Sequence, residues 1–145
     1  MEKSNNPTLI DLPKFCDPRG NLSVIESIKN IPFKFVRAYW IYDVPAGRER
    51  HGHAFKTQEE FIVALSGSFD VVLNDGTNER RYHLARSYYG IYVPKLTWRE
   101  LDNFSTNSVA LILSSTFYDE NDYIEDFEQF KSLIRDNNDR FAQNI

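Results

Sequence analysis

The densest polar cluster of the sequence is the segment from Arg48 to Lys56, which reads Arg-Glu-Arg-His-Gly-His-Ala-Phe-Lys. It contains His51 and His53, two of the chain's three histidines, together with three basic residues. If this segment is a strand, the spacing of two places both imidazoles on one face. Imidazoles on one face can bind a metal ion or transfer protons, since the unperturbed pKa of histidine lies near about 6.5.

Metal binding is the less favoured of these two interpretations. An H-x-H pair in a β-barrel suggests a cupin, and Glu60 fits a later part of the metal-cupin pattern. However, the gap from His53 to Glu60 is too long, and the turn Gly90–Pro94 leads to Trp98 where a further histidine is needed. Two neutral imidazoles without a third ligand make a poor divalent-metal site. We therefore expect no metal and interpret His53 as a proton carrier.

The other two histidines carry less information. His51 is as compatible with an exposed loop as with a functional contact, and the isolated His83 is interpreted as structural.

Short strands are predicted to position these residues. Strand-like runs separated by turn residues fill the chain from about residue 22 to residue 117, and Asn74-Asp75-Gly76 is a strong hairpin signal. Many short strands without intervening helices predict an all-β sandwich or barrel. The expected strands are Leu22–Ile25, Phe35–Tyr42, Phe61–Leu65, Phe69–Leu73, Arg80–Leu84, Gly90–Val93 and Val109–Ser114.

The end of the chain has a helical pattern. From Asp119 onward the apolar residues fall on one face of a helix, and Asp119 and Asn121 are candidate caps. We expect a helix over about residues 119–136 and a frayed tail beyond it. The whole chain, residues 1–145, is interpreted as one domain.

The composition limits the partners. With 145 residues, 41% hydrophobic and 26% charged, the chain is typical of a soluble globular domain. A net charge of −4 argues against general binding of nucleic acid or of anionic membranes, but is compatible with a local basic site for a phosphorylated small molecule. The single Cys16 excludes an intrachain disulfide, and there is no long apolar run. We therefore expect a cytoplasmic protein without a membrane span.

Several motifs, in unbroken order from about residue 17 to residue 125, resemble those of the cupin-fold nucleotide-sugar 3,4-ketoisomerases. That family acts on dTDP-4-keto-6-deoxy-D-glucose. When the motifs are aligned on Gly67-Ser68, the first histidine of the family's H-A-H falls on His53 and the second on Phe55. The matching segments are Arg19–Leu22, Arg37–Tyr39, Arg50–Lys56, Gly67-Ser68, Asp75-Gly76, Gly90–Glu100 and Tyr118–Ile124.

The resemblance implies a cupin jelly-roll β-barrel with a short C-terminal helix and an enzyme that moves a ketone from C4 to C3 through an enediol. His53 is then the base that removes the proton from C3 and delivers one to C4, with no cofactor. Tyr39 is the candidate for moving a proton between the sugar oxygens or stabilising the enediolate, with strand packing as its alternative. The resemblance also implies a pathway to an amino-deoxysugar of a surface glycan, such as a lipopolysaccharide O-antigen, and a homodimer with exchanged N-terminal strands.

The pyrophosphate of a dTDP-sugar favours guanidinium and ammonium groups. Trp98 is expected either to cover the thymine or sugar ring or to fill the barrel mouth. Glu100 is expected to orient a basic neighbour or to bind the ligand, and Tyr118–Ile124 to dock the helix. The candidate substrate-binding residues are Arg19, Arg37, Arg50, Lys56, His51, Trp98, Arg99 and Glu100.

Two other functions remain open. The absence of the second family histidine is compatible with a non-catalytic nucleotide-sugar-binding cupin. A 3,5-epimerase of the same fold also uses a histidine and a tyrosine, but the acidic partner expected behind its histidine is not apparent in the sequence.

Overall fold

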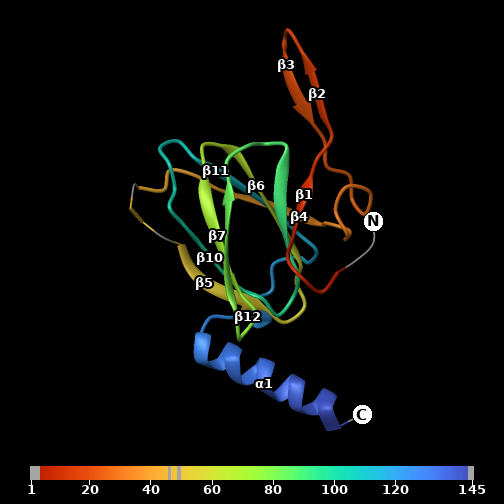
Figure 1. Cartoon of the computed structure of the whole chain (residues 1–145), viewed down its shortest axis with the longest axis vertical. Helices are drawn as coiled ribbons and strands as arrows, with labels where there is room; N and C mark the ends of the chain where they lie inside the picture. Colours follow the sequence, from red (N-terminus) through yellow and green to blue (C-terminus); the bar gives the residue numbers. More distant parts are fainter. Residues whose placement is uncertain (1–3, 46, 49, 144–145) are drawn as a thin grey trace.

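Two five-stranded antiparallel sheets form the body of the protein in a jelly-roll arrangement (Figure 1). The computed structural model describes residues 4–45, 47–48 and 50–143, without the side chains of Arg50 and His51. The first sheet has the order β1 (Thr8–Asp11), β9 (Tyr89–Val93), β6 (Glu60–Ser66), β11 (Val109–Ser114) and β4 (Arg37–Ile41). The second has the order β12 (Tyr123–Ile124), β5 (Arg50–Phe55), β10 (Trp98–Asp102), β7 (Phe69–Asn74) and β8 (Glu79–Leu84). The predicted all-β fold with one C-terminal helix is confirmed.

The core lies between the two sheets, because alternate residues of each strand point inward. Ile62 of β6, Leu101 of β10 and Ile112 of β11 are fully buried there. Two intervening residues of β6, Phe61 and Val63, are also buried, since they pack against Ile31 and its neighbours on the outer face of the first sheet. Burial of both faces explains why β6 is a continuous apolar run after its first residue.

A hairpin of β2 (Lys14–Asp17) and β3 (Gly20–Ser23) projects beyond the sheets (Figure 1). All eight of its residues are exposed, including the large apolar side chains of Phe15 and Leu22. The predicted strand from Leu22 to Ile25 therefore ends earlier, at Ser23. The sequence analysis does not predict β1, β2, β10 or β12, which are short or mix apolar with polar residues.

The predicted helix over residues 119–136 is wrong at both ends, because α1 spans Phe127–Gln143. The carboxylate of Asp126 accepts hydrogen bonds from the backbone N–H groups of Glu128 (2.8 Å) and Gln129 (3.1 Å), as an N-cap does. Asp119 instead caps the short 3₁₀ helix Glu120–Asp122, and β12 then pairs with β5. Strand pairing overrides the helical spacing there, and α1 runs through most of the tail that was expected to fray.

Helix α1 lies under the second sheet (Figure 1). Its Phe130 is fully buried against Ala54 and Trp98 on the outer face of that sheet. No helix among the described residues is both long and apolar enough to cross a membrane.

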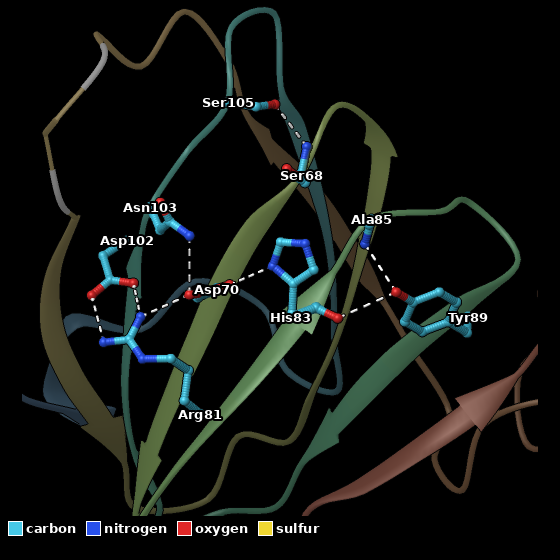
Figure 2. A network of polar contacts seen from close by, with 9 residues as sticks. All are labelled: Ser68, Asp70, Arg81, His83, Ala85, Tyr89, Asp102, Asn103 and Ser105. Carbon is cyan, nitrogen blue, oxygen red and sulfur yellow. Dashed lines mark hydrogen bonds and ion pairs between the residues drawn. The ribbon is translucent and has the colours of Figure 1, made fainter.

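A polar network covers another part of the outer face of the second sheet (Figure 2). Asp70 is almost fully buried, and its Oδ1 lies 2.6 Å from Nδ1 of His83. Its Oδ2 accepts hydrogen bonds from Arg81 Nη1 (2.9 Å) and Asn103 Nδ2 (3.2 Å), and Arg81 also pairs with Asp102. These contacts are compatible with the structural role predicted for His83.

Candidate active site

Four of the polar side chains between the sheets come from four different strands. Tyr39 of β4 packs against the core, and Glu60 of β6 precedes the inward-facing Ile62 by two residues. Arg99 of β10 precedes the inward-facing Leu101 by two residues and lies opposite His53 of β5 in the strand register. Because side chains on one face of a strand recur every two residues, both sheets direct these groups toward the interior.

Arg99, Glu60 and Tyr39 form a hydrogen-bonded group across the two sheets. Arg99 and Glu60 are 3% and 1% exposed, and Arg99 Nε donates to Glu60 Oε1 at 2.5 Å. Arg99 Nη2 donates to the phenolic oxygen of Tyr39 at 2.8 Å, and the Tyr39 hydroxyl donates to Glu60 Oε2. The phenol therefore donates to the buried anion and accepts from the buried cation.

The two charges have opposite effects on the phenol. Burial raises the pKa of Tyr39 well above its ordinary value; Arg99 opposes this rise, and Glu60 adds to it. Burial alone would lower the pKa of Arg99, but the attraction of Glu60 and Tyr39 outweighs burial and holds that pKa above its ordinary value. Tyr39 is therefore a neutral phenol, and Arg99 a fixed cation, throughout the neutral pH range.

A second polar group adjoins the first through Gln58, which is 2% exposed. Gln58 Nε2 donates to Glu60 Oε2 at 3.1 Å, and Gln58 Oε1 accepts from Arg37 Nη2 (3.0 Å) and Thr116 Oγ1 (2.7 Å). The Arg37 guanidinium lies 5.1 Å from the ring centre of Tyr39, and its buried Nε has no hydrogen-bond partner among the described residues. Arg37 as a whole is only partly buried, and a guanidinium is suited to bind a phosphate oxygen.

Aromatic rings surround His53, which is half-buried. Phe55 meets the imidazole edge-on at 4.9 Å between ring centres, and Tyr123 lies at 5.2 Å. Tyr123 reaches this position because β12 pairs it with Phe55, and Asp122 anchors the segment by accepting from the backbone N–H of Gln58 at 3.0 Å. These rings restrict the orientation of the imidazole.

The segment Tyr118–Ile124, predicted to dock the helix, does so only in part. Ile124 packs against Phe130 of α1, as expected. Tyr118 instead faces Arg37, with 5.7 Å between its ring centre and the guanidinium, and contacts Tyr123. The segment therefore also contributes two aromatic rings next to His53 and Arg37.

Trp98 and Glu100 do not join this group. They share the face of β10 opposite to Arg99, and Trp98 packs against Phe127 and Phe130 with ring centres 5.2 and 5.8 Å apart. Trp98 Nε1 donates to Glu100 Oε1 at 3.0 Å. Trp98 therefore lies beneath α1, neither filling the barrel mouth nor placed with Arg99, and this placement argues against the substrate contacts expected for both residues.

The remaining predicted binding residues lie apart from the buried cluster or cannot be placed. Lys56 is exposed and donates to the backbone oxygen of Asn121 at 3.1 Å. Arg19 is on the projecting hairpin, where its highly exposed side chain pairs with Asp17 at 2.9 Å. The side chains of Arg50 and His51 lie outside the described residues.

Three residues of the cluster escape the sequence analysis. Gln58 and Thr116 are not identified at all, and Glu60 is considered only as part of a metal pattern. A signal for Glu60 exists, because a carboxylate at the start of a fully buried strand needs a buried partner. Gln58 and Thr116 give no comparable signal. Among the described residues no group of three or more histidine, cysteine or acidic side chains is arranged to hold a metal ion.

The chain is similar in sequence to known proteins. The family model described as FdtA, WxcM-like, C-terminal matches residues 5–135. The TDP-4-oxo-6-deoxy-alpha-D-glucose-3,4-oxoisomerase of Aneurinibacillus thermoaerophilus is 40% identical over 126 residues, which are 87% of this chain and 91% of that protein.

Solved structures agree. A 3,4-ketoisomerase from Helicobacter canadensis superposes with a TM-score of 0.87 at 36% identity, covering 91% of this chain and 99% of that one. The 3,4-ketoisomerase QdtA from Thermoanaerobacterium thermosaccharolyticum, solved as a histidine-to-asparagine variant in complex with TDP-4-keto-6-deoxyglucose, gives a TM-score of 0.88 at 30% identity. That match covers 92% of this chain and 97% of QdtA.

Proposed function

The chain belongs to the FdtA, WxcM-like, C-terminal family, and from this we propose that it is a TDP-sugar 3,4-ketoisomerase. Its substrate is TDP-4-keto-6-deoxyglucose, whose ketone it moves from C4 to C3. The observation that carries the assignment is the convergence of His53 and Tyr39 on the buried Arg99–Glu60 pair. The identity to a 3,4-oxoisomerase over 87% of the chain supports it.

The carbon-bound proton is assigned to His53. A neutral imidazole removes the proton from C3 of the sugar and leaves an enediolate with negative charge on the C4 oxygen. The imidazolium exchanges its proton with solvent and then delivers a proton to C4. Contacts with Phe55 and Tyr123 hold the ring in one orientation, which suits a base that serves two neighbouring carbons.

The oxygen-bound proton is assigned to Tyr39. Its hydroxyl gives a proton to the C4 oxygen of the enediolate, and the resulting phenolate takes the proton of the C3 hydroxyl. As that O–H bond breaks, the C3 carbonyl forms, and C4 accepts its proton from His53. Arg99, which donates to the phenolic oxygen, stabilises the transient phenolate. Atoms and electrons balance within the sugar, so the step needs no oxidant or reductant.

Arg37 is our candidate for binding the diphosphate. Its side chain is only partly buried, and its guanidinium lies near the rings of Tyr39 and Tyr118. Arg50, His51 and Lys56, from the polar segment, remain candidates for further contacts with the nucleotide. Trp98 and Glu100 are not proposed as ligand contacts, because Trp98 packs against α1 and Glu100 accepts a hydrogen bond from Trp98 on the same face of β10.

The two alternative functions are not favoured. Each relative reported above is named as a 3,4-isomerase, at 30–40% identity over most of the chain. A purely nucleotide-sugar-binding role leaves the buried Tyr39–Glu60–Arg99 group without a purpose. A 3,5-epimerase is distinguished by the proton that it exchanges at C5.

The functional form is proposed to be a homodimer that exchanges N-terminal strands. The projecting hairpin exposes Phe15 and Leu22, about 60% of each, and an apolar groove of about 390 Å³ beside β6 and β11 includes Phe35, Val63 and Leu111. We also place the enzyme in the cytoplasm and in the synthesis of an amino-deoxysugar for a surface glycan.

The test is proton NMR of TDP-4-keto-6-deoxyglucose with the purified protein in deuterated buffer, beside the variant His53→Asn. The proposal expects a 3-keto sugar with deuterium at C4 and none at C5, and neither product nor exchange with the variant. Deuterium at C5 would identify an epimerase. Binding of TDP without any exchange would identify a binding protein and reject the enzyme.

A further inference from the structure

Glu60 has no part in the reaction as written above, although its carboxylate lies behind Tyr39. A carboxylate has about four lone-pair positions for hydrogen-bond donors. Four donors contact Glu60: Nε and Nη2 of Arg99, the hydroxyl of Tyr39 and Nε2 of Gln58. Its side chain is only 1% exposed. Three of these donors meet Oε2 and one meets Oε1, so the carboxylate is a buried anion held by protein donors rather than a group waiting to bind substrate.

The hydrogen bonds also define the state of the phenol. The single proton of Tyr39 is directed to Glu60, and one lone pair of the phenolic oxygen accepts from Arg99. A phenolic oxygen has one further lone pair, which remains for a substrate hydroxyl. Without Glu60, the attraction of Arg99 would no longer be balanced by an anion in contact with the phenol, and the phenol would lose its proton at a lower pH than in wild type.

We infer that Glu60 is a positioning residue for the isomerisation: its buried charge balances Arg99 and holds the proton of Tyr39, so that each turnover begins with a protonated phenol whose free lone pair orients the C3 hydroxyl of the sugar. This inference rests on the proposed ketoisomerase function. When charge develops on the C4 oxygen, the phenolic proton turns from Glu60 to that oxygen, and the C3 hydroxyl proton then replaces it. Glu60 remains ionised throughout. At the end of the turnover the Tyr39 hydroxyl again donates its hydrogen bond to Glu60.

The charged and titratable groups around Tyr39 favour this role. Glu60 approaches from β6 and Arg99 from β10, while Arg37 lies on the same strand as Tyr39. Tyr123 of β12 adds a weaker effect that, like that of Glu60, opposes ionisation of the phenol, and His53 neighbours Arg99 in the strand register. Among these groups, Glu60 is the anion in direct contact with the phenol.

The test compares the pH profiles of kcat for wild type, Glu60→Gln and Glu60→Asp. In wild type, ionisation of Tyr39 causes no loss of kcat up to about pH 10, the ordinary tyrosine value. Glu60→Gln removes the anion and leaves Arg99, so kcat falls about 10²-fold and an alkaline limb appears at a lower pH than in wild type, while KM changes little. Glu60→Asp keeps the charge but shortens the reach, so kcat falls without the new limb.

A second measurement separates removal of the C3 proton from the later proton transfers that form the product. In deuterated buffer, Glu60→Gln should still exchange the C3 proton through His53 while forming product slowly. In the background of Tyr39→Phe, Glu60→Gln should have little further effect on kcat, because Glu60 acts through the missing hydroxyl. If Glu60→Gln does not fold, the same cycle with Glu60→Asp and Tyr39→Phe decides the question.

Several outcomes would overturn the inference. These are an unchanged pH profile in a folded Glu60→Gln protein, an equal loss of exchange and product formation, or a full additional loss in the Tyr39→Phe background. Any of them would leave Glu60 with a structural role only. Failure of the proposed function itself looks different, since wild type would then form no 3-keto sugar at all.

Discussion

Replacement of Trp98 by alanine separates a structural role from a ligand-binding one. The side chain is 7% exposed and packs against Phe127 and Phe130, which join α1 to the second sheet. Removing a buried tryptophan costs about 3–5 kcal/mol, and that range includes the loss of a hydrogen bond such as the one to Glu100. At about 2–4 °C per kcal/mol for a chain of this size, we expect the melting temperature to fall by roughly 6–20 °C.

The assay pairs chemical denaturation with calorimetric titration of TDP, both at one fixed protein concentration, because the stability of the proposed dimer would depend on concentration. Trp98→Ala should lower the free energy of unfolding and leave the affinity for TDP unchanged at a temperature where the variant is folded. Phe130 belongs to the same contact between α1 and the second sheet, so Phe130→Ala should also lower the free energy of unfolding and leave the affinity for TDP unchanged. Arg37→Met should instead leave the free energy of unfolding near that of wild type. Its affinity for TDP should be lower by about tenfold or more, because a charged hydrogen bond is lost.

The reasoning fails if Trp98→Ala weakens TDP binding by tenfold while the melting temperature stays that of wild type. Trp98 would then contact the nucleotide, as the sequence analysis expects, and the face assigned to it beneath α1 would be wrong.

Three further predictions concern stability. Arg99→Met should cost about 3–5 kcal/mol in urea denaturation, since it leaves Glu60 buried without its cation; a cost below about 1 kcal/mol would contradict the buried pair. Asp126→Ala should cost about 1 kcal/mol and loosen the start of α1, measured by amide exchange, because it removes the N-cap. Burial opposes ionisation of Asp70. Hydrogen bonds from His83, Arg81 and Asn103 outweigh burial and lower the pKa of this carboxyl group. Since its folded pKa is depressed, Asp70 stabilises the protein above its unfolded pKa, about 3.9, and this contribution is lost as the pH falls through the folded pKa. Asp70→Asn should therefore flatten the acid side of a plot of stability against pH, and an unchanged slope would contradict the network.

The amino-acid sequence alone predicts the chemistry and the class of fold. Turn residues and short apolar runs locate β6 and β11, and alternation locates β7, because these signals are local in the sequence. The ordered motifs around His53 and Tyr39 predict the ketoisomerase family, which the comparisons confirm. The net charge restricts the class of ligand, and the single cysteine excludes an intrachain disulfide.

Tertiary structure decides which residues meet. Tyr123 and Ile124 have helical spacing but form a strand, because pairing with β5 is available only after the chain has folded. Trp98 belongs to a matching motif, yet it faces α1 rather than Arg99, and that choice depends on which face of β10 the helix covers. Glu60 meets Arg99 and Tyr39 across two sheets, at sequence separations of 39 and 21. Local patterns carry no information about such distances, because they follow from how the two sheets pack together.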